Sequence, residues 1–76
     1  MEVKKVVMVL TGEMRRAEIQ KNLQLKNDEN FRLQYIIPAL ESGNITMKFP
    51  NNPNHPNQKY KLTTKGMELK SFLQKD

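Results

Sequence analysis

The sequence of 76 residues contains no cysteine, no tryptophan and a single histidine. The absence of cysteine excludes disulfide bonds and thiolate metal sites, so the fold must depend on packing alone. The apolar run over 6–10 is much shorter than the roughly 20 residues that a membrane-spanning helix needs, and no cleavage site of a signal peptide follows it. We therefore expect one small domain over 1–76, located in the cytoplasm and not bound to a membrane.

Groupings of residues that carry out catalysis are also missing. The lone histidine, His55, lies in a stretch rich in asparagine and proline, with no clustered acidic residue beside it. The chain shows no paired-carboxylate, nucleophile–base or metal-ligand spacing. We therefore predict that this chain is not an enzyme, holds no metal and requires no cofactor.

What the sequence does contain is an excess of positive charge, with a formal net charge of +5. Most of the excess falls within 42–67, a segment without an acidic residue. A basic segment of this kind suits a polyanion such as nucleic acid. The alternative is a solvated strand face whose lysines protect an exposed sheet edge. The lysines of this segment are Lys48, Lys59, Lys61 and Lys65.

The hydrophobic pattern predicts three helices in the first half of the chain. Apolar residues over 3–10 follow the spacing of one helical face, although the valines there also suit a strand. A second helix is expected over about 15–23, and a third from after the capping residue Asn27 to residue 41. Pro38 must bend this third helix, or break it so that it restarts with the proline in its first turn.

The second half of the chain predicts a hairpin and a last helix. Apolar and polar residues alternate over 45–49 and again over 58–63, which indicates two half-buried strands joined by a turn-rich loop. Met14 is expected to pair with this hairpin, and Thr64 to cap a final helix. Together these elements predict an α+β fold of the winged helix-turn-helix type, with three helices, a β-hairpin wing and a C-terminal helix.

Several short motifs occur in order along the chain. They are Asn30-Phe31-Arg32, Pro38-Ala39-Leu40, Gln58-Lys59-Tyr60 and Lys65-Gly66. This set resembles a bacterial winged-helix domain found at the C-terminal end of Fic-like proteins and of Schlafen/AlbA-type ATP-binding proteins, many of which are named RecG-like or transcriptional regulators. Gln24 and Asn44 depart from the pattern, because glycine and an apolar residue are usual there. The resemblance implies an accessory module of a longer protein.

A winged helix reads DNA bases with its third helix and holds the backbone with other basic groups. Arg32 and Gln34 are residue types that bind guanine and adenine edges, so they and Asn30 are predicted base contacts. Arg32 has an alternative, which is an ion pair with Asp28 or Glu29. The predicted backbone contacts come from the second helix, the turn and the hairpin: Arg15, Arg16, Lys26, Lys48, Lys59 and Lys61.

A second hypothesis concerns the apolar residues of the third helix. Leu33 and Ile37 flank the predicted base contacts, and apolar side chains there favour a protein partner over a DNA groove. The domain would then be a protein-interaction or dimerisation module that does not bind nucleic acid. Weak, salt-sensitive binding to duplex DNA is the first hypothesis, and association with a protein partner or a second copy is the other.

Overall fold

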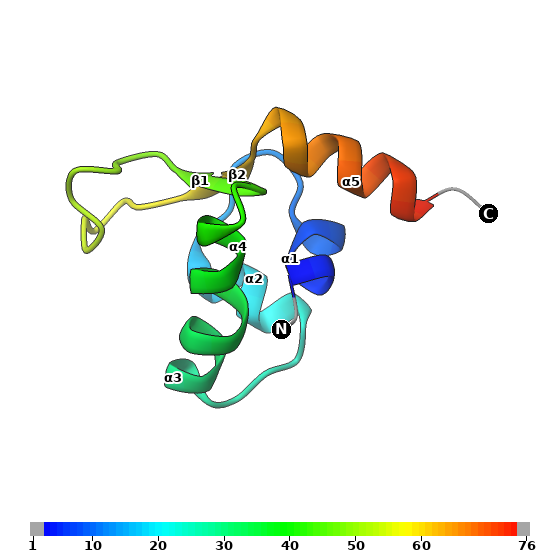
Figure 1. The fold of residues 1–76 in the computed structure, drawn as a ribbon. Helices are drawn as coiled ribbons and strands as arrows, with labels where there is room; N and C mark the ends of the chain where they lie inside the picture. Colours follow the sequence, from blue (N-terminus) through cyan, green and yellow to red (C-terminus); the bar gives the residue numbers. More distant parts are fainter. Residues whose placement is uncertain (1–2, 75–76) are drawn as a thin grey trace.

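The computed structural model describes residues 3–74, which form a small α+β fold with a long hairpin projecting from one end of a group of helices (Figure 1). This arrangement is consistent with a winged-helix-like fold. The helices α3, η1 and α4 follow one another without a break and act as one long helix. The elements in order are α1 (Val3–Val9), α2 (Arg16–Asn22), α3 (Asp28–Phe31), η1 (Arg32–Ile36), α4 (Ile37–Glu41), β1 (Ile45–Met47), β2 (Tyr60–Leu62) and α5 (Thr64–Gln74).

The hydrophobic core lies where α1, α2 and the long helix meet the base of the hairpin. The segment 3–10 contributes to it from a helix, so the strand alternative for this segment is wrong. None of the helices within residues 3–74 is long and apolar enough to span a bilayer. The buried residues of the core cluster are Val6, Leu10, Met14, Ile19, Phe31, Ile36, Ala39, Ile45 and Tyr60.

The turn after α2 requires a left-handed residue, and Gln24 supplies it with a φ of 58°. The Leu25 N–H donates to the carbonyl of Gln20 at 3.2 Å, and the Gln24 N–H donates to that of Lys21 at 3.0 Å. These two bonds are the Schellman pattern, in which the residue after the helix is usually glycine. The positive φ considered for Gln24 from the sequence is therefore confirmed.

Side-chain capping then starts the long helix. The Asn27 Oδ1 accepts a hydrogen bond from the backbone N–H of Asn30 at 2.7 Å, which confirms Asn27 as the cap. Pro38 explains the change of geometry farther along, because its ring would collide with the carbonyl of Gln34 in a regular α-helix. Over η1 the backbone widens into a π turn, with the Ile37 N–H donating to the Arg32 carbonyl, and Pro38 lies in the first turn of α4. The sequence predicts either a bend or a restart at Pro38; the structure has Pro38 in the first turn of α4, and the π geometry is not predicted by the sequence.

The hairpin strands pair antiparallel, with Ile45 opposite Leu62 and Met47 opposite Tyr60. Met14 forms an isolated bridge to Tyr60 through two backbone hydrogen bonds of 2.9 and 2.7 Å, as predicted. Each strand has three residues, so both are shorter than the sequence predicts.

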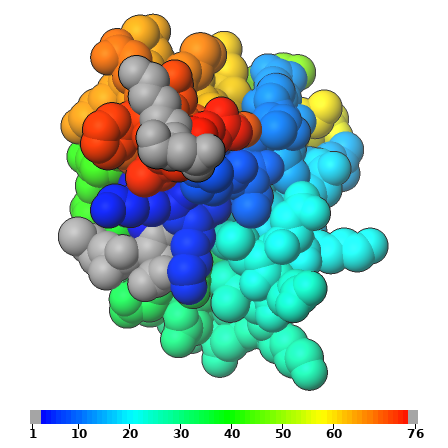
Figure 2. All heavy atoms as spheres, turned by 90° about the vertical axis from the view of Figure 1, so that its right-hand side faces the viewer, coloured from blue at the N-terminus to red at the C-terminus, as the bar shows by residue number. Residues whose placement is uncertain are grey.

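The last helix, α5, lies against α1, as the space-filling view shows (Figure 2). The Lys70 Nζ donates to the carbonyl of Leu10 at 2.9 Å and fixes α5 to the end of α1. The cap of α5 is Thr63, whose Oγ1 accepts from the Gly66 N–H at 3.1 Å. The prediction of Thr64 as the cap is wrong by one residue, because Thr64 is already the first residue of α5 and the capping bond comes from the residue before it, Thr63.

Candidate nucleic-acid interface

The predicted base contacts lie on the surface of the long helix. Asn30, Arg32 and Gln34 are all exposed. Within residues 3–74 the Arg32 side chain makes no ion pair and no hydrogen bond. Asp28, one of the partners considered for it, instead accepts a hydrogen bond from the Gln20 Nε2 at 2.7 Å. The guanidinium of Arg32 is therefore available to a ligand.

The loop between the two strands is organised by one side chain, that of Gln58. Its Oε1 accepts from the backbone N–H groups of Phe49 and Lys59, at 2.9 and 3.2 Å. Its Nε2 donates to the carbonyls of Phe49 and Asn52, at 2.9 and 3.2 Å. The Gln58 side chain thus joins the two ends of the loop through backbone hydrogen bonds. Sequence reasoning missed this role, although the Gln-Lys-Tyr motif was part of the resemblance.

The single histidine is also structural. The ring of His55 stacks on that of Phe49, with 3.9 Å between centroids and 11° between planes. Its Nδ1 accepts from the backbone N–H of Asn57 at 2.9 Å. The loop is consequently an ordered body with neutral asparagine and proline residues at its tip.

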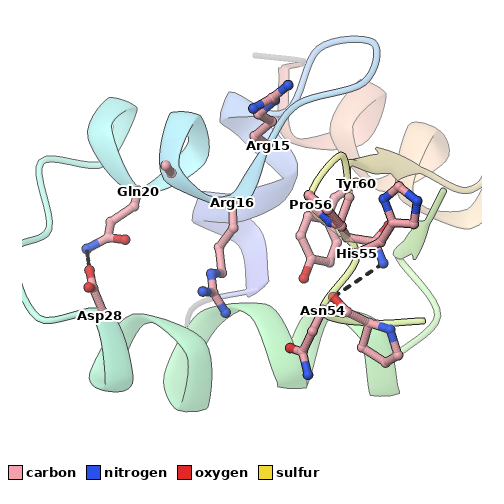
Figure 3. Close-up of a pocket in the computed structure, with 11 residues that line it drawn as sticks. Arg15, Arg16, Gln20, Asp28, Asn54, His55, Pro56 and Tyr60 are labelled. Atoms are coloured by element: carbon pink, nitrogen blue, oxygen red, sulfur yellow. Dashed lines mark hydrogen bonds between the residues drawn. The ribbon is translucent and has the colours of Figure 1, made fainter. Parts of the chain in front are cut away.

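A hollow of about 330 Å³ separates this loop from the beginning of α2 (Figure 3). We call it the α2–loop hollow. Arg16 points into the space between α2 and the long helix, whereas Arg15 points the other way (Figure 3). Gln20 and Asp28 lie at the end of the hollow away from Tyr60. The residues that define its two sides are Arg15, Arg16 and Gln20 on one and His55, Gln58 and Tyr60 on the other.

Tyr60 combines burial with a polar group that faces this hollow. The residue is 6% exposed, and its hydroxyl has no hydrogen-bond partner within residues 3–74. Burial raises the pKa of the Tyr60 phenol, and the positive charge of Arg16 offsets part of that rise. The phenol therefore stays protonated at neutral pH and is a free donor.

The lysines of the hairpin lie on the other face of the sheet. Side chains alternate along a strand, so Lys59 and Lys61 point away from the side that Tyr60 occupies. Lys61 lines a second, more apolar hollow beside Met67 of α5. The structure thus divides the predicted backbone contacts into two groups, with Arg16 on one face of the hairpin and the lysines on the other.

The hairpin lysines also differ in whether their ammonium groups contact another protein group. The Lys48 Nζ lies 3.7 Å from a carboxylate oxygen of Glu13, an exposed ion pair. The Lys65 Nζ donates to the carbonyl of Ser42 at 2.6 Å. Lys61 is exposed and has no such partner in the described part of the chain. Lys48 and Lys65 thus already contact protein groups, and within residues 3–74 Lys48 alone of the two faces an opposite charge.

The remaining predicted residues lie apart from both groups. Lys26 and Asn30 line a shallow hollow of about 200 Å³ at the beginning of α3. Leu33 is 46% exposed, whereas Ile37 is half-buried. In α5, Met67 and Phe72 are 58% and 71% exposed. Across residues 3–74 no three His, Asp or Glu side chains gather in a way that could hold a metal ion.

Comparison with known proteins connects this fold to one family. Residues 1–63 match the family described as "Filamentation induced by cAMP protein Fic-like, C-terminal domain". The structure is similar to a Fic family protein from Desulfovibrio desulfuricans G20, with a TM-score of 0.76 and 30% identity over 83% of this chain. The match spans only 20% of that protein. No curated protein matches the sequence. The Fic-like part of the predicted resemblance is confirmed.

Proposed function

Because the chain belongs to the Fic-like C-terminal domain family, we propose that it binds duplex DNA as a winged helix, as an accessory or regulatory module of a larger bacterial protein. The observation that carries this proposal is the exposed face of the long helix. Asn30, Arg32 and Gln34 lie there with their side chains in solvent, and the Arg32 guanidinium is unpaired within the described residues. In a winged helix this element enters the major groove.

Backbone contacts provide most of the affinity in this proposal. Arg16 is the first residue of α2, Lys26 lies in the turn that links α2 to α3, and Lys61 extends from the hairpin. Neutralisation of phosphates by such groups gives dissociation constants of about 10⁻⁴ to 10⁻⁶ M without sequence preference. We therefore expect weak binding with little discrimination between sequences.

The test is an amide chemical-shift map of the chain with a short duplex at two salt concentrations. Shifts are expected at 28–34 and should shrink at the higher salt. An Arg32→Ala variant should lose part of the affinity, and Lys4→Ala, a charge change on the exposed side of α1, is the matched control. If no amide shifts at low salt with DNA in excess, the proposal fails.

The second candidate function is contact with a protein, and the exposure of large apolar side chains favours it. Leu33, Met67 and Phe72 present apolar surface to solvent from two different helices. Apolar groups of this kind serve as anchors in protein interfaces. Sedimentation of the chain over a range of concentrations measures self-association directly, and a strictly monomeric chain would exclude dimerisation as the function.

A further inference from the structure

We propose that the α2–loop hollow binds a phosphate group, with the Arg16 guanidinium and the Tyr60 hydroxyl as its ligands. The phosphate belongs either to a nucleic-acid backbone or to a small phosphorylated molecule. The first case rests on the function proposed above and gives it a defined backbone contact, and the second does not depend on it.

The Tyr60 hydroxyl is the group that lacks a partner. It belongs to a residue that is 6% exposed, and no described residue accepts a hydrogen bond from it. The ring is buried, whereas the hydroxyl reaches the α2–loop hollow, where it has no described protein partner and is open to a ligand. Figure 3 shows this hydroxyl at the opening between Arg16 and Asn54. An anionic oxygen in the hollow would accept its proton.

Arg16 supplies the positive charge that a phosphate in the hollow would need. Its side chain extends from the first residue of α2 toward the long helix and makes no ion pair within residues 3–74. A guanidinium binds phosphate through two parallel hydrogen bonds, which combine charge with a fixed geometry. Arg16 and Tyr60 line the same hollow, and Figure 3 shows both side chains extending into its space from opposite sides.

The walls of the hollow are preformed. Gln58 holds the loop closed through backbone contacts on both arms, and His55 is stacked on Phe49. The acidic residue that lines the hollow, Asp28, is bonded to Gln20 at the far end from Tyr60. An anion therefore fits at the Tyr60 end, where it meets donors and not a carboxylate.

The experiment is an amide chemical-shift titration of the 76-residue chain with inorganic phosphate, at an ionic strength held constant with sodium chloride. A second titration uses a short duplex. The variants are Arg16→Gln, and Tyr60→Phe, which removes only the hydroxyl. The matched control is Lys4→Gln, a loss of one charge on the exposed side of α1.

Phosphate should shift the amides of 15–17 and 54–60 to saturation. Affinity should fall about tenfold or more in Arg16→Gln and in Tyr60→Phe, as for loss of a hydrogen bond to a charged group, and should not change in Lys4→Gln. Chloride alone should not produce these shifts. If phosphate produces no saturable shift, or if all three variants bind it equally, the proposal is overturned.

The duplex arm separates the two sources of phosphate. If the duplex shifts the same amides and Tyr60→Phe weakens it, the ligand is the nucleic-acid backbone. If phosphate binds and the duplex does not, the hollow serves a small phosphorylated molecule and the DNA-binding function fails alone. If the duplex shifts the amides of 28–34 while neither ligand shifts the amides of the hollow, the phosphate site fails and DNA binding stands.

Discussion

Gly66 packs directly against the backbone carbonyl of Asn44, so a Cβ at position 66 would overlap that oxygen. Alanine normally stabilises a helix relative to glycine by about 1 kcal/mol. At this position it must push α5 away from the chain before β1. We expect Gly66→Ala to lower the free energy of unfolding by about 1–3 kcal/mol, as overpacking does. Urea denaturation followed by circular dichroism measures the change.

Ser71→Ala is the control for this effect, because Ser71 is an exposed residue of the same helix. It should raise the free energy of unfolding by a few tenths of a kcal/mol, about the difference in helix propensity. A Gly66→Ala variant as stable as the parent would show that α5 can move away at little cost.

The second prediction concerns Asn44, and here we expect a substitution to raise the free energy of unfolding. Its Nδ2 donates to the Ser42 Oγ at 2.7 Å, but its buried Oδ1 has no hydrogen-bond partner among residues 3–74. An unpaired buried acceptor costs about 1–3 kcal/mol. Asn44→Leu keeps the branched shape and removes the unpaired oxygen, so we expect a gain of about 1 kcal/mol and a higher Tm. A lower Tm would mean that the Ser42 contact outweighs the unpaired oxygen.

Gln24 leads to the third prediction, because it adopts a positive φ that glycine adopts without strain. Gln24→Gly should raise the free energy of unfolding by up to about 1 kcal/mol. The control is Lys21→Gly within α2, which should lower it by about the same amount. Both values come from thermal melts, and a destabilised Gln24→Gly would show that its side chain contributes to packing.

The helical elements could be predicted from the sequence because their signals are local. The spacing of the valines places α1, Asn27 marks the beginning of α3, and Pro38 marks a bend or a restart of the long helix. The π turn could not be predicted, because a bend and a widened turn both relieve the same clash. The identity of the α5 cap depended on a shift of one residue, which is within the usual uncertainty of helix ends.

The candidate site could be predicted only in part. Exposure of Arg32 and Gln34 follows from helical periodicity, and the outward lysines follow from strand alternation. Arg16 and Tyr60 line the same α2–loop hollow although they are far apart in the chain, and no local pattern indicates this placement. The contact between Lys48 and Glu13 is equally non-local, so the sequence overstates the free charge of the hairpin.

The fourth prediction concerns the outer face of the hairpin. Lys59→Glu combined with Lys61→Glu should weaken duplex binding uniformly across sequences, because phosphate contacts carry no base information. If about four phosphates are neutralised in the parent, log K should fall with log salt at a slope of about −3.6, and the double variant should show a shallower slope. Fluorescence anisotropy over a salt series measures both, after circular dichroism shows that the variant is folded. Equal affinity would show that this face does not contribute to binding.

The last prediction distinguishes the two functions on the long helix, where Arg32 and Leu33 are adjacent and both exposed. If the helix reads DNA, Arg32→Ala should lose about 1–3 kcal/mol of discrimination at one base position, and Leu33→Asp should have a small effect. If the helix binds a protein, the order reverses, because an apolar anchor replaced by a buried charge abolishes association while a rim arginine mainly affects its rate. Leu33 is a better test than Ile37, because Leu33 is 46% exposed whereas Ile37 is half-buried. Duplex binding and sedimentation are measured for both variants. A folded Leu33→Asp variant that loses a dimer present in the parent would favour the protein-interaction function.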